Sequence, residues 1–296
     1  KREAAMSTQT GPQTGNVADQ PPQSESWARR LWRTITQSQA LVLMLFLVVI
    51  IILISLWAPR FLQPSNLAVI VRQTSFIALA SMGQMLALIA GVIDLSVGAT
   101  AGFAGICAAM LMNATPINPY LALLVGILVG TFIGLINGLL VAYVRLNPFI
   151  VTLSMSFVIS GLILVVTGGW AIPDMPDSIL WLGQENIGGV PVPTIVTLAV
   201  ALVLAFVLNR TFIGRHIFAV GGNKDAANLV GIRVPRIIVL VYMIAGTLSA
   251  LAGVLMLARL ASGQPTIGAT WLMPSFAAPI LGGAALSGGA GSVLGT

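Results

Sequence analysis

Residues 120–143 read YLALLVGILVGTFIGLINGLLVAY, a run of 24 residues without a single Asp, Glu, Lys or Arg. About 20 apolar residues in a helix cross the roughly 30 Å of hydrocarbon in a bilayer. Glycine recurs every fourth residue, at Gly126, Gly130, Gly134 and Gly138, so the four glycines share one helix face. Such a face lets the backbones of two membrane helices approach closely. The stretch therefore predicts a transmembrane helix packed tightly against a neighbour.

The composition of the whole chain agrees with a location in lipid. Of 296 residues, 57% are hydrophobic and 7% are charged, and the mean hydropathy is +0.99. A soluble domain carries about 25% charged residues, so this chain has too few polar side chains to cover itself with a wetted surface. We predict an all-α fold, a polytopic transmembrane helix bundle. Nucleic-acid binding is excluded as a function because no basic face is interleaved with aromatic residues.

Seven apolar runs are predicted as membrane spans, and an eighth differs from them. The seven are Ala40–Trp57, Leu67–Val92, Leu95–Met112, Tyr120–Tyr143, Phe149–Thr167, Val192–Leu208 and Ile237–Leu257. The eighth, Leu272–Leu294, is rich in glycine and small residues, so we expect a re-entrant or broken segment there. Residues 38–296 form the predicted membrane domain. Because the chain stops at Thr296 without a polar tail, we expect further helices to be missing at that end.

The basic residues predict the orientation of these spans, because Lys and Arg concentrate in cytoplasmic loops. Arg29, Arg30 and Arg33 precede the first span, and Arg145 follows the fourth. The connector between Arg210 and Arg236 contains five basic residues, whereas the loop after the fifth span holds Asp174, Asp177 and Glu185 and no basic residue. We therefore place the connector in the cytoplasm and the acidic loop outside; Arg60 is an exception to this alternation. Residues 1–37 are predicted to be a disordered tail followed by the basic segment before the first span, and residues 1–5, which precede Met6, resemble a vector or leader remnant.

Catalysis is poorly supported by the residues present. The chain has one histidine, His216, and one cysteine, Cys107, too few for a nucleophile–base pair or a metal cluster. It also lacks the GxxxxGK[ST] loop that cradles the phosphates of ATP. We therefore predict no catalytic residue, no metal and no cofactor on this chain. If ATP drives its work, a separate subunit must bind the nucleotide.

The motif GVIDLSVG at residues 91–98 is the first candidate site, a helix break or part of a translocation path formed by Gly91, Asp94, Ser96 and Gly98. A charge in hydrocarbon costs about 2.5–3.5 kcal/mol, so Asp94 needs a partner or a polar cavity. One hypothesis is that Asp94 and Ser96 line the solute path in a broken helix pair. The other is that Asp94 caps the following helix by accepting backbone N–H groups. The sequence leaves both open.

The cytoplasmic connector contains the second candidate site. Residues 223–231, NKDAANLVG, predict a short helix that ends at a glycine. A short helix at the membrane surface is suited to dock into a groove on a soluble partner, although it can equally be a plain surface connector. The predicted contact residues are Gly221, Gly222, Asn223, Lys224, Asp225, Ala226, Ala227 and Gly231.

Several ordered blocks together resemble a known family, the permease subunits of ATP-binding cassette importers for ribose, xylose, galactose and the autoinducer-2 signal. The resemblance runs from about Asn66 to Thr296. It is carried by GVIDLSVG at 91–98, NGLLVA at 137–142, NPFIVTL at 147–153, GRHIFAVGGN at 214–223, AR at 258–259, QPT at 264–266 and LGGAALSGG at 281–289. In one departure, residues 271–276, WLMPSF, lack the acidic pair usual in the family before the last block.

The resemblance implies a permease for a simple, pentose-like sugar in the bacterial inner membrane, working as a dimer. Two ATPase subunits, which hold ATP and Mg, and a periplasmic sugar-binding protein would be its partners, and Gly221–Gly231 would be the cytoplasmic coupling helix. An ion-coupled secondary transporter is the alternative, with Asp94 as its one candidate acidic residue and no convincing inverted repeat. A membrane-embedded enzyme is opposed by the scarcity of His, Cys and paired acids.

Overall fold

The structure is a computed structural model that describes residues 39–58 and 60–296, with side chains from Leu45 onward. The compact unit runs from Gln39 to Thr296. The predicted disordered tail and the basic segment before the first span, residues 1–37 with Arg29, Arg30 and Arg33, lie outside the described residues.

Seven long helices follow the seven predicted spans, with ends that differ by a few residues. They are α2 (Gln39–Trp57), α3 (Pro64–Ile89), α4 (Val97–Ala114), α5 (Pro119–Ala142), α6 (Pro148–Thr167), α8 (Val192–Arg210) and α11 (Val234–Leu260). Prolines at the first turn mark where several of them begin, because proline has no N–H to leave unpaired there. Asn118 and Asn147 cap α5 and α6 by accepting from the amides of Tyr120 and Phe149.

Within the described part of the chain, five helices are long and apolar enough to cross a membrane: α4, α5, α6, α8 and α11. Leu45–Trp57 of α2 is a shorter apolar helix. Helix α3 is long, but it carries Arg72, Gln73 and Gln84 among its apolar residues, and it is not one of the five. The protein is therefore an all-α, multi-pass membrane protein, as its composition predicts.

The glycine face predicted on residues 126–138 lies in the contact between α5 and its neighbours, above all α11. A Cβ built on Gly134 would stand 2.2 Å from the carbonyl oxygen of Tyr242, and one on Gly138 would stand 2.8 Å from the Cα of Val239. On the facing helix, a Cβ on Gly246 would lie 2.2 Å from the carbonyl oxygen of Gly130. Side chains are therefore excluded from both sides of this helix pair, which confirms the close approach that the sequence predicts.

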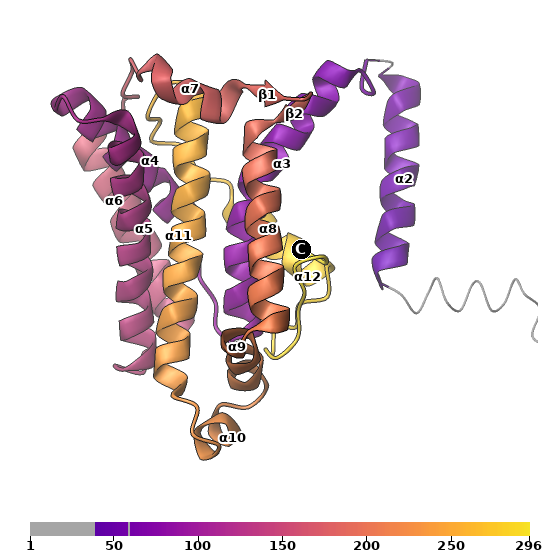
Figure 1. Cartoon of the computed structure of the whole chain (residues 1–296), viewed down its shortest axis with the longest axis vertical. Coiled ribbons are helices and arrows are strands. Elements are labelled where there is room, and N and C mark those ends of the chain that lie inside the picture. Colours follow the sequence, from indigo (N-terminus) through magenta and orange to yellow (C-terminus); the bar gives the residue numbers. More distant parts are fainter. Residues whose placement is uncertain (1–38, 59) are drawn as a thin grey trace, which may run out of the picture. The chain divides into compact units, whose positions relative to one another are not determined.

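The acidic loop and the basic connector lie at opposite ends of the helices (Figure 1). The acidic end carries α7 (Asp177–Gln184) and an antiparallel pair of two-residue strands, β1 (Asn186–Ile187) and β2 (Val190–Pro191). There Arg72 donates a hydrogen bond to Asn186 Oδ1 at 2.7 Å, and Arg259 donates to Gln73 Oε1.

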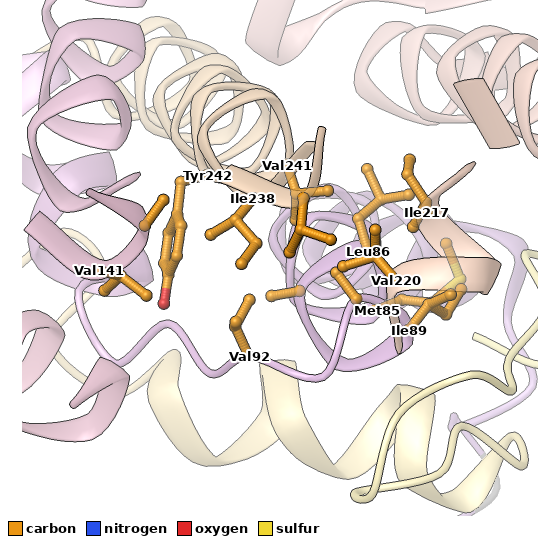
Figure 2. Close-up of a cluster of buried hydrophobic side chains, with 14 of the residues drawn as sticks. Met85, Leu86, Ile89, Val92, Val141, Ile217, Val220, Ile238, Val241 and Tyr242 are labelled. Atoms are coloured by element: carbon orange, nitrogen blue, oxygen red, sulfur yellow. The ribbon is translucent and has the colours of Figure 1, made fainter. Parts of the chain in front are cut away.

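The basic connector holds two helices where the sequence predicts one. The predicted short helix is α10 (Lys224–Leu229), and Gly231 follows it with a φ of 85°. The helix before it, α9 (Phe212–Gly222), is not predicted by the sequence pattern. This helix forms because Ile217 and Val220 are buried against α3 in one hydrophobic cluster (Figure 2), and Thr211 caps its first turn. Tertiary packing thus stabilises a segment whose glycines favour a loop.

The last apolar stretch is broken, as predicted. Helix α12 (Leu272–Leu281) is only 10 residues long, and the chain continues to Thr296 through turns without a further helix. Helix α12 packs against α3. The segment before it, residues 261–271, packs on α4, where the carbonyl oxygens of Ile267 and Gly268 approach Gly102 and Gly98. The non-helical backbone at residues 267–268 is therefore covered by α4, and such cover is what irregular backbone needs inside a membrane.

Candidate functional site

The motif at 91–98 forms a break between two helices. Helix α3 ends at Ile89, and α4 begins at Val97. Two hydrogen bonds close the end of α3: the Gly91 amide donates to the Leu88 carbonyl and the Val92 amide to the Ala87 carbonyl, each at 2.9 Å. This pattern needs a residue in the left-handed region at position 91, where glycine has a φ of 69°. The structure thus places Gly91 at the point where the chain leaves the helix.

Asp94 lies in the break and is held by polar side chains. It is 2% exposed, and it accepts hydrogen bonds from the Ser96 amide at 2.8 Å and the Ser96 hydroxyl at 2.6 Å. Asn137 of α5 donates from Nδ2 to Ser96 Oγ at 2.9 Å. The Tyr242 hydroxyl of α11 donates to the Ile93 carbonyl at 2.8 Å. We call Asp94, Ser96, Asn137 and Tyr242 the buried polar cluster.

The buried polar cluster bears on the two hypotheses for Asp94. The carboxylate accepts the amide of Ser96, the residue just before α4, and no amide further into the helix. The cap is thus an Asx-type turn that sets the entry into α4. Asn137 and Tyr242 were not among the predicted site residues. Asn137 had a signal in the sequence, because it is a lone amide within an apolar run; the position of Tyr242 depends on how α11 packs.

Two glycine pairs, 221–222 and 288–289, meet Gly91 and Ile89 where α3 ends, although the three segments are far apart in sequence. A Cβ on Gly221 of α9 would lie 1.6 Å from the Ile89 carbonyl oxygen. One on Gly288 would lie 2.9 Å from the Cα of Gly91 and 2.6 Å from the Gly221 oxygen. The Gly289 amide donates to the Ile89 carbonyl at 2.9 Å. We call this contact of residues 89–91, 221–222 and 288–289 the glycine node.

The glycine node brings the two predicted sites together. Gly221, predicted as part of the coupling region, touches the backbone of the helix break that begins at Gly91. Lys224, at the start of α10, also reaches the break, because its Nζ donates to the Gly91 carbonyl at 3.4 Å. Gly222 is different, since a Cβ there would meet nothing within 4 Å. The blocks at 91–98, 214–223 and 281–289, which are separate in the sequence, therefore meet in one contact.

Helix α10 is the most exposed part of this end. Asn223 caps it by accepting from the amides of Asp225 and Ala226 at 3.0 Å. Lys224, Asp225 and Ala226 are exposed, and Ala227 is buried against the rest of the protein. The next apolar side chains point outward: Leu229 is 89% exposed and Val230 is 76% exposed. An apolar tip beside charged residues is the composition of a surface that docks on another protein.

A cavity of about 220 Å³ lies on the other side of the break. Leu95, Gly98 and Ala99 form one wall, α6 forms a second, and the segment before α12 forms the third. Of the four predicted path residues, Gly98 lines this cavity, whereas Asp94, Ser96 and Gly91 do not. Leu95 stands between Asp94 and Ser96, so successive side chains of the break face different surroundings.

These features are those of a polytopic membrane protein: helices long enough to span, a broken apolar segment and an exposed helix at a basic end. The comparisons with known proteins give the family. Residues 66–296 match the family described as branched-chain amino acid transport system / permease component, and the chain belongs to this family. No solved structure matches the chain significantly.

Similar proteins of known role are permeases of sugar importers. The chain is 38% identical to the ribose import permease protein RbsC of Bacillus subtilis, over 82% of this chain and 76% of that protein. It is 38% identical to the D-allose transport system permease protein AlsC of Escherichia coli, over 79% and 72%. It is 33% identical to the L-arabinose ABC transporter permease protein AraH of Azospirillum brasilense, over 82% and 71%. The resemblance to ribose-type ABC permeases is thereby confirmed, which favours an ABC permease over the ion-coupled alternative.

Proposed function

We propose that this chain is the permease subunit of an ATP-driven importer for a simple, pentose-like sugar in a bacterial inner membrane. The observation that carries the proposal is its similarity, over most of its length, to permeases named for ribose, allose and arabinose. No bond in the solute is made or broken. The helices instead expose a path alternately to one face of the membrane and then to the other.

The proposal includes partners at both ends. The basic end faces the cytoplasm and meets two ATPase subunits, which hold ATP and Mg. The acidic end, with α7 and the strand pair, meets a periplasmic sugar-binding protein, and a second permease chain completes the path. Charge supports this orientation, since Arg210, Arg215, Lys224, Arg233 and Arg236 lie at the α9–α10 end.

We assign the contact with the ATPase to α10 and the residues beside it. The exposed Leu229 and Val230 supply apolar surface, and Lys224 and Asp225 supply polar contacts around it. Buried apolar anchors with a polar rim are the usual anatomy of a protein interface. The predicted coupling residues, Gly221 to Gly231, comprise α10 and the residues on either side of it, and together they form this contact.

Reconstitution tests the function directly. The chain is purified with the ATPase encoded beside it, placed in liposomes, and supplied with the binding protein and labelled ribose, allose, arabinose or xylose. We expect uptake of at least one sugar that requires ATP and the binding protein. Uptake driven by a proton or sodium gradient without ATP would overturn the proposal in favour of a secondary transporter.

Replacing Leu229 tests the coupling contact. In Leu229→Glu, a charge replaces an apolar side chain that is 89% exposed in the single chain, so folding should be unaffected. We expect ATP-dependent uptake to fall about tenfold and co-purification of the ATPase to weaken, because interface anchors are worth 1–2 kcal/mol or more. Leu229→Met keeps the apolar surface and is the matched control. Equal uptake by Leu229→Glu and Leu229→Met would remove α10 from the coupling contact.

A further inference from the structure

The cavity beside the helix break has the properties of a site for an uncharged, hydroxyl-bearing ligand. We propose that it binds one sugar molecule in transit, with Ser156 and Ser160 of α6 as the hydrogen-bonding groups. Asp94 does not touch the sugar; it holds Ser96 in the helix break beside the opposite wall. This inference rests on the proposed function, and it specifies where within the permease the sugar is held.

The position of the cavity suits a site in transit. Ser156 and Ser160 are eight and twelve residues from Pro148, the first residue of α6. At about 1.5 Å per residue they stand about 12 to 18 Å from that end, near the middle of a 30 Å hydrocarbon layer. The wall opposite α6 is the end of the helix break and the first turn of α4, and the third wall is mainly the non-helical segment before α12.

The two hydroxyls are free to bind a ligand. They are one helical turn apart on α6, so they share a face, and neither makes a hydrogen bond within the described part of the protein. One turn earlier on the same helix, Thr152 donates to the Pro148 carbonyl at 2.8 Å. Ser81 and Ser249 on other helices bond backwards in the same way. The hydroxyl groups of Ser156 and Ser160 can therefore donate hydrogen bonds to a ligand in the cavity.

The remaining lining sets the charge and shape of the ligand. No ionisable side chain lines the cavity, and the carboxylate of Asp94, which is not part of the lining, accepts from Ser96. Apolar side chains such as Leu95, Ile163 and Ile267 cover most of the wall. A monosaccharide presents hydroxyls at its edge and C–H groups on its faces, which matches a mostly apolar cavity with two hydroxyls. An ion or a charged amino acid finds no partner there.

Two glycines in close contact, Gly98 and Gly268, border the cavity on the α4 side. Gly98 lines it, and a Cβ at this position would lie 2.2 Å from the Gly268 carbonyl oxygen. Gly268 itself has a φ of 81°, which glycine adopts without strain. The first turn of α4 and the segment before α12 therefore meet backbone to backbone, and this contact borders the site.

Alanine substitution measures the role of the hydroxyls. In the reconstituted importer, the double variant Ser156→Ala, Ser160→Ala should transport sugar about tenfold more slowly, the effect of losing one or two hydrogen bonds to the ligand. ATP hydrolysis stimulated by the binding protein should stay within about twofold of wild type, because the coupling end is untouched. The control is Ser154→Ala, since Ser154 lies on the same helix but outside the cavity. Wild-type transport by the double variant would overturn the site.

Thiol labelling gives a second, independent readout. Cys107 is the only cysteine, so Cys107→Ala provides a background in which Ser160→Cys is the sole thiol. We expect a small polar thiol reagent to react with it, and cycling sugar to slow the reaction. Reaction only with membrane-soluble reagents would show that position 160 faces lipid and would overturn the inference. If wild type shows no ATP-dependent uptake at all, the proposed function fails instead, so the two failures are distinguishable.

Discussion

Glycine is used in two different ways in this protein, between α5 and α11 and at the glycine node. The glycines of α5 are helical, and they let two long helices lie against each other along their length. At the node, Gly91 and Gly288 have φ values of 69° and 91°. Together with Gly221 they bring three segments of the chain into contact. The first arrangement makes a rigid pair, whereas the second connects α9 and α10 to the helix break. We therefore expect damage to the first to affect folding and damage to the second to affect coupling.

The largest effect is expected at Gly134. In Gly134→Leu, the side chain meets the Tyr242 backbone, which a Cβ would approach to 2.2 Å, so α5 and α11 must separate. We expect a loss of roughly 3 kcal/mol or more in stability and little monodisperse protein after detergent extraction. The control is Gly161→Leu on α6, where a Cβ meets nothing within 4 Å. Similar yields and thermal midpoints for both variants would contradict the rigid-pair interpretation.

A smaller and different effect is expected at Gly221. In Gly221→Ala, the new methyl group collides with the Ile89 carbonyl and must push α9 away from the break. We expect the complex to assemble and hydrolyse ATP while sugar uptake falls about tenfold, a change of about 1.4 kcal/mol. The adjacent Gly222→Ala is the control, because it adds the same methyl group to open space.

A second variant keeps the Gly221 test decisive if the first fails to assemble. Gly288→Ala perturbs the same contact from the other side, where a Cβ would lie 2.6 Å from the Gly221 oxygen. Uptake per ATP hydrolysed is the quantity to compare. If Gly221→Ala and Gly288→Ala both match Gly222→Ala in this ratio, the node has no part in coupling.

The smallest effect is expected at Gly91. A Cβ there would have its nearest neighbours at 3.7 Å, so space is available and only the backbone conformation resists a side chain. Gly91→Ala should cost about 1 kcal/mol through its positive φ, and Gly91→Asn less, because Asn tolerates this region better. Thermal midpoints of the purified importer measure the difference. An Asn variant less stable than the Ala variant would show that packing, and not conformation, selects glycine here.

Much of the fold was predictable because the signals are local. Apolar runs predicted seven helices, and the spacing in Gly126–Gly138 predicted a close helix contact. Asn223 and Gly231 predicted α10 from its two ends. Helix α9 was missed, because Ile217 and Val220 stabilise it only through burial against α3, which no local pattern reveals.

The candidate sites were predictable as residues but not as contacts. Gly91, Asp94 and Ser96 are in the break, as their motif predicts, yet the partners Asn137 and Tyr242 come from other helices. Ser156 and Ser160 were not predicted as site residues, because two hydroxyls one turn apart in an apolar helix usually bond to their own backbone. Their position in the lining of the cavity distinguishes them from other serines in the apolar helices.

The sequence by itself determined that this chain is a membrane protein of several helices, with a break near Asp94 and a short helix in a basic connector. Those properties follow from hydropathy, charge and capping residues within a few turns of chain. Only the tertiary structure decided that residues 89–91, 221–222 and 288–289 touch, and that Ser96, which donates to Asp94, accepts a hydrogen bond from Asn137 of α5. Such contacts join segments far apart in sequence, and their geometry depends on how all the helices pack.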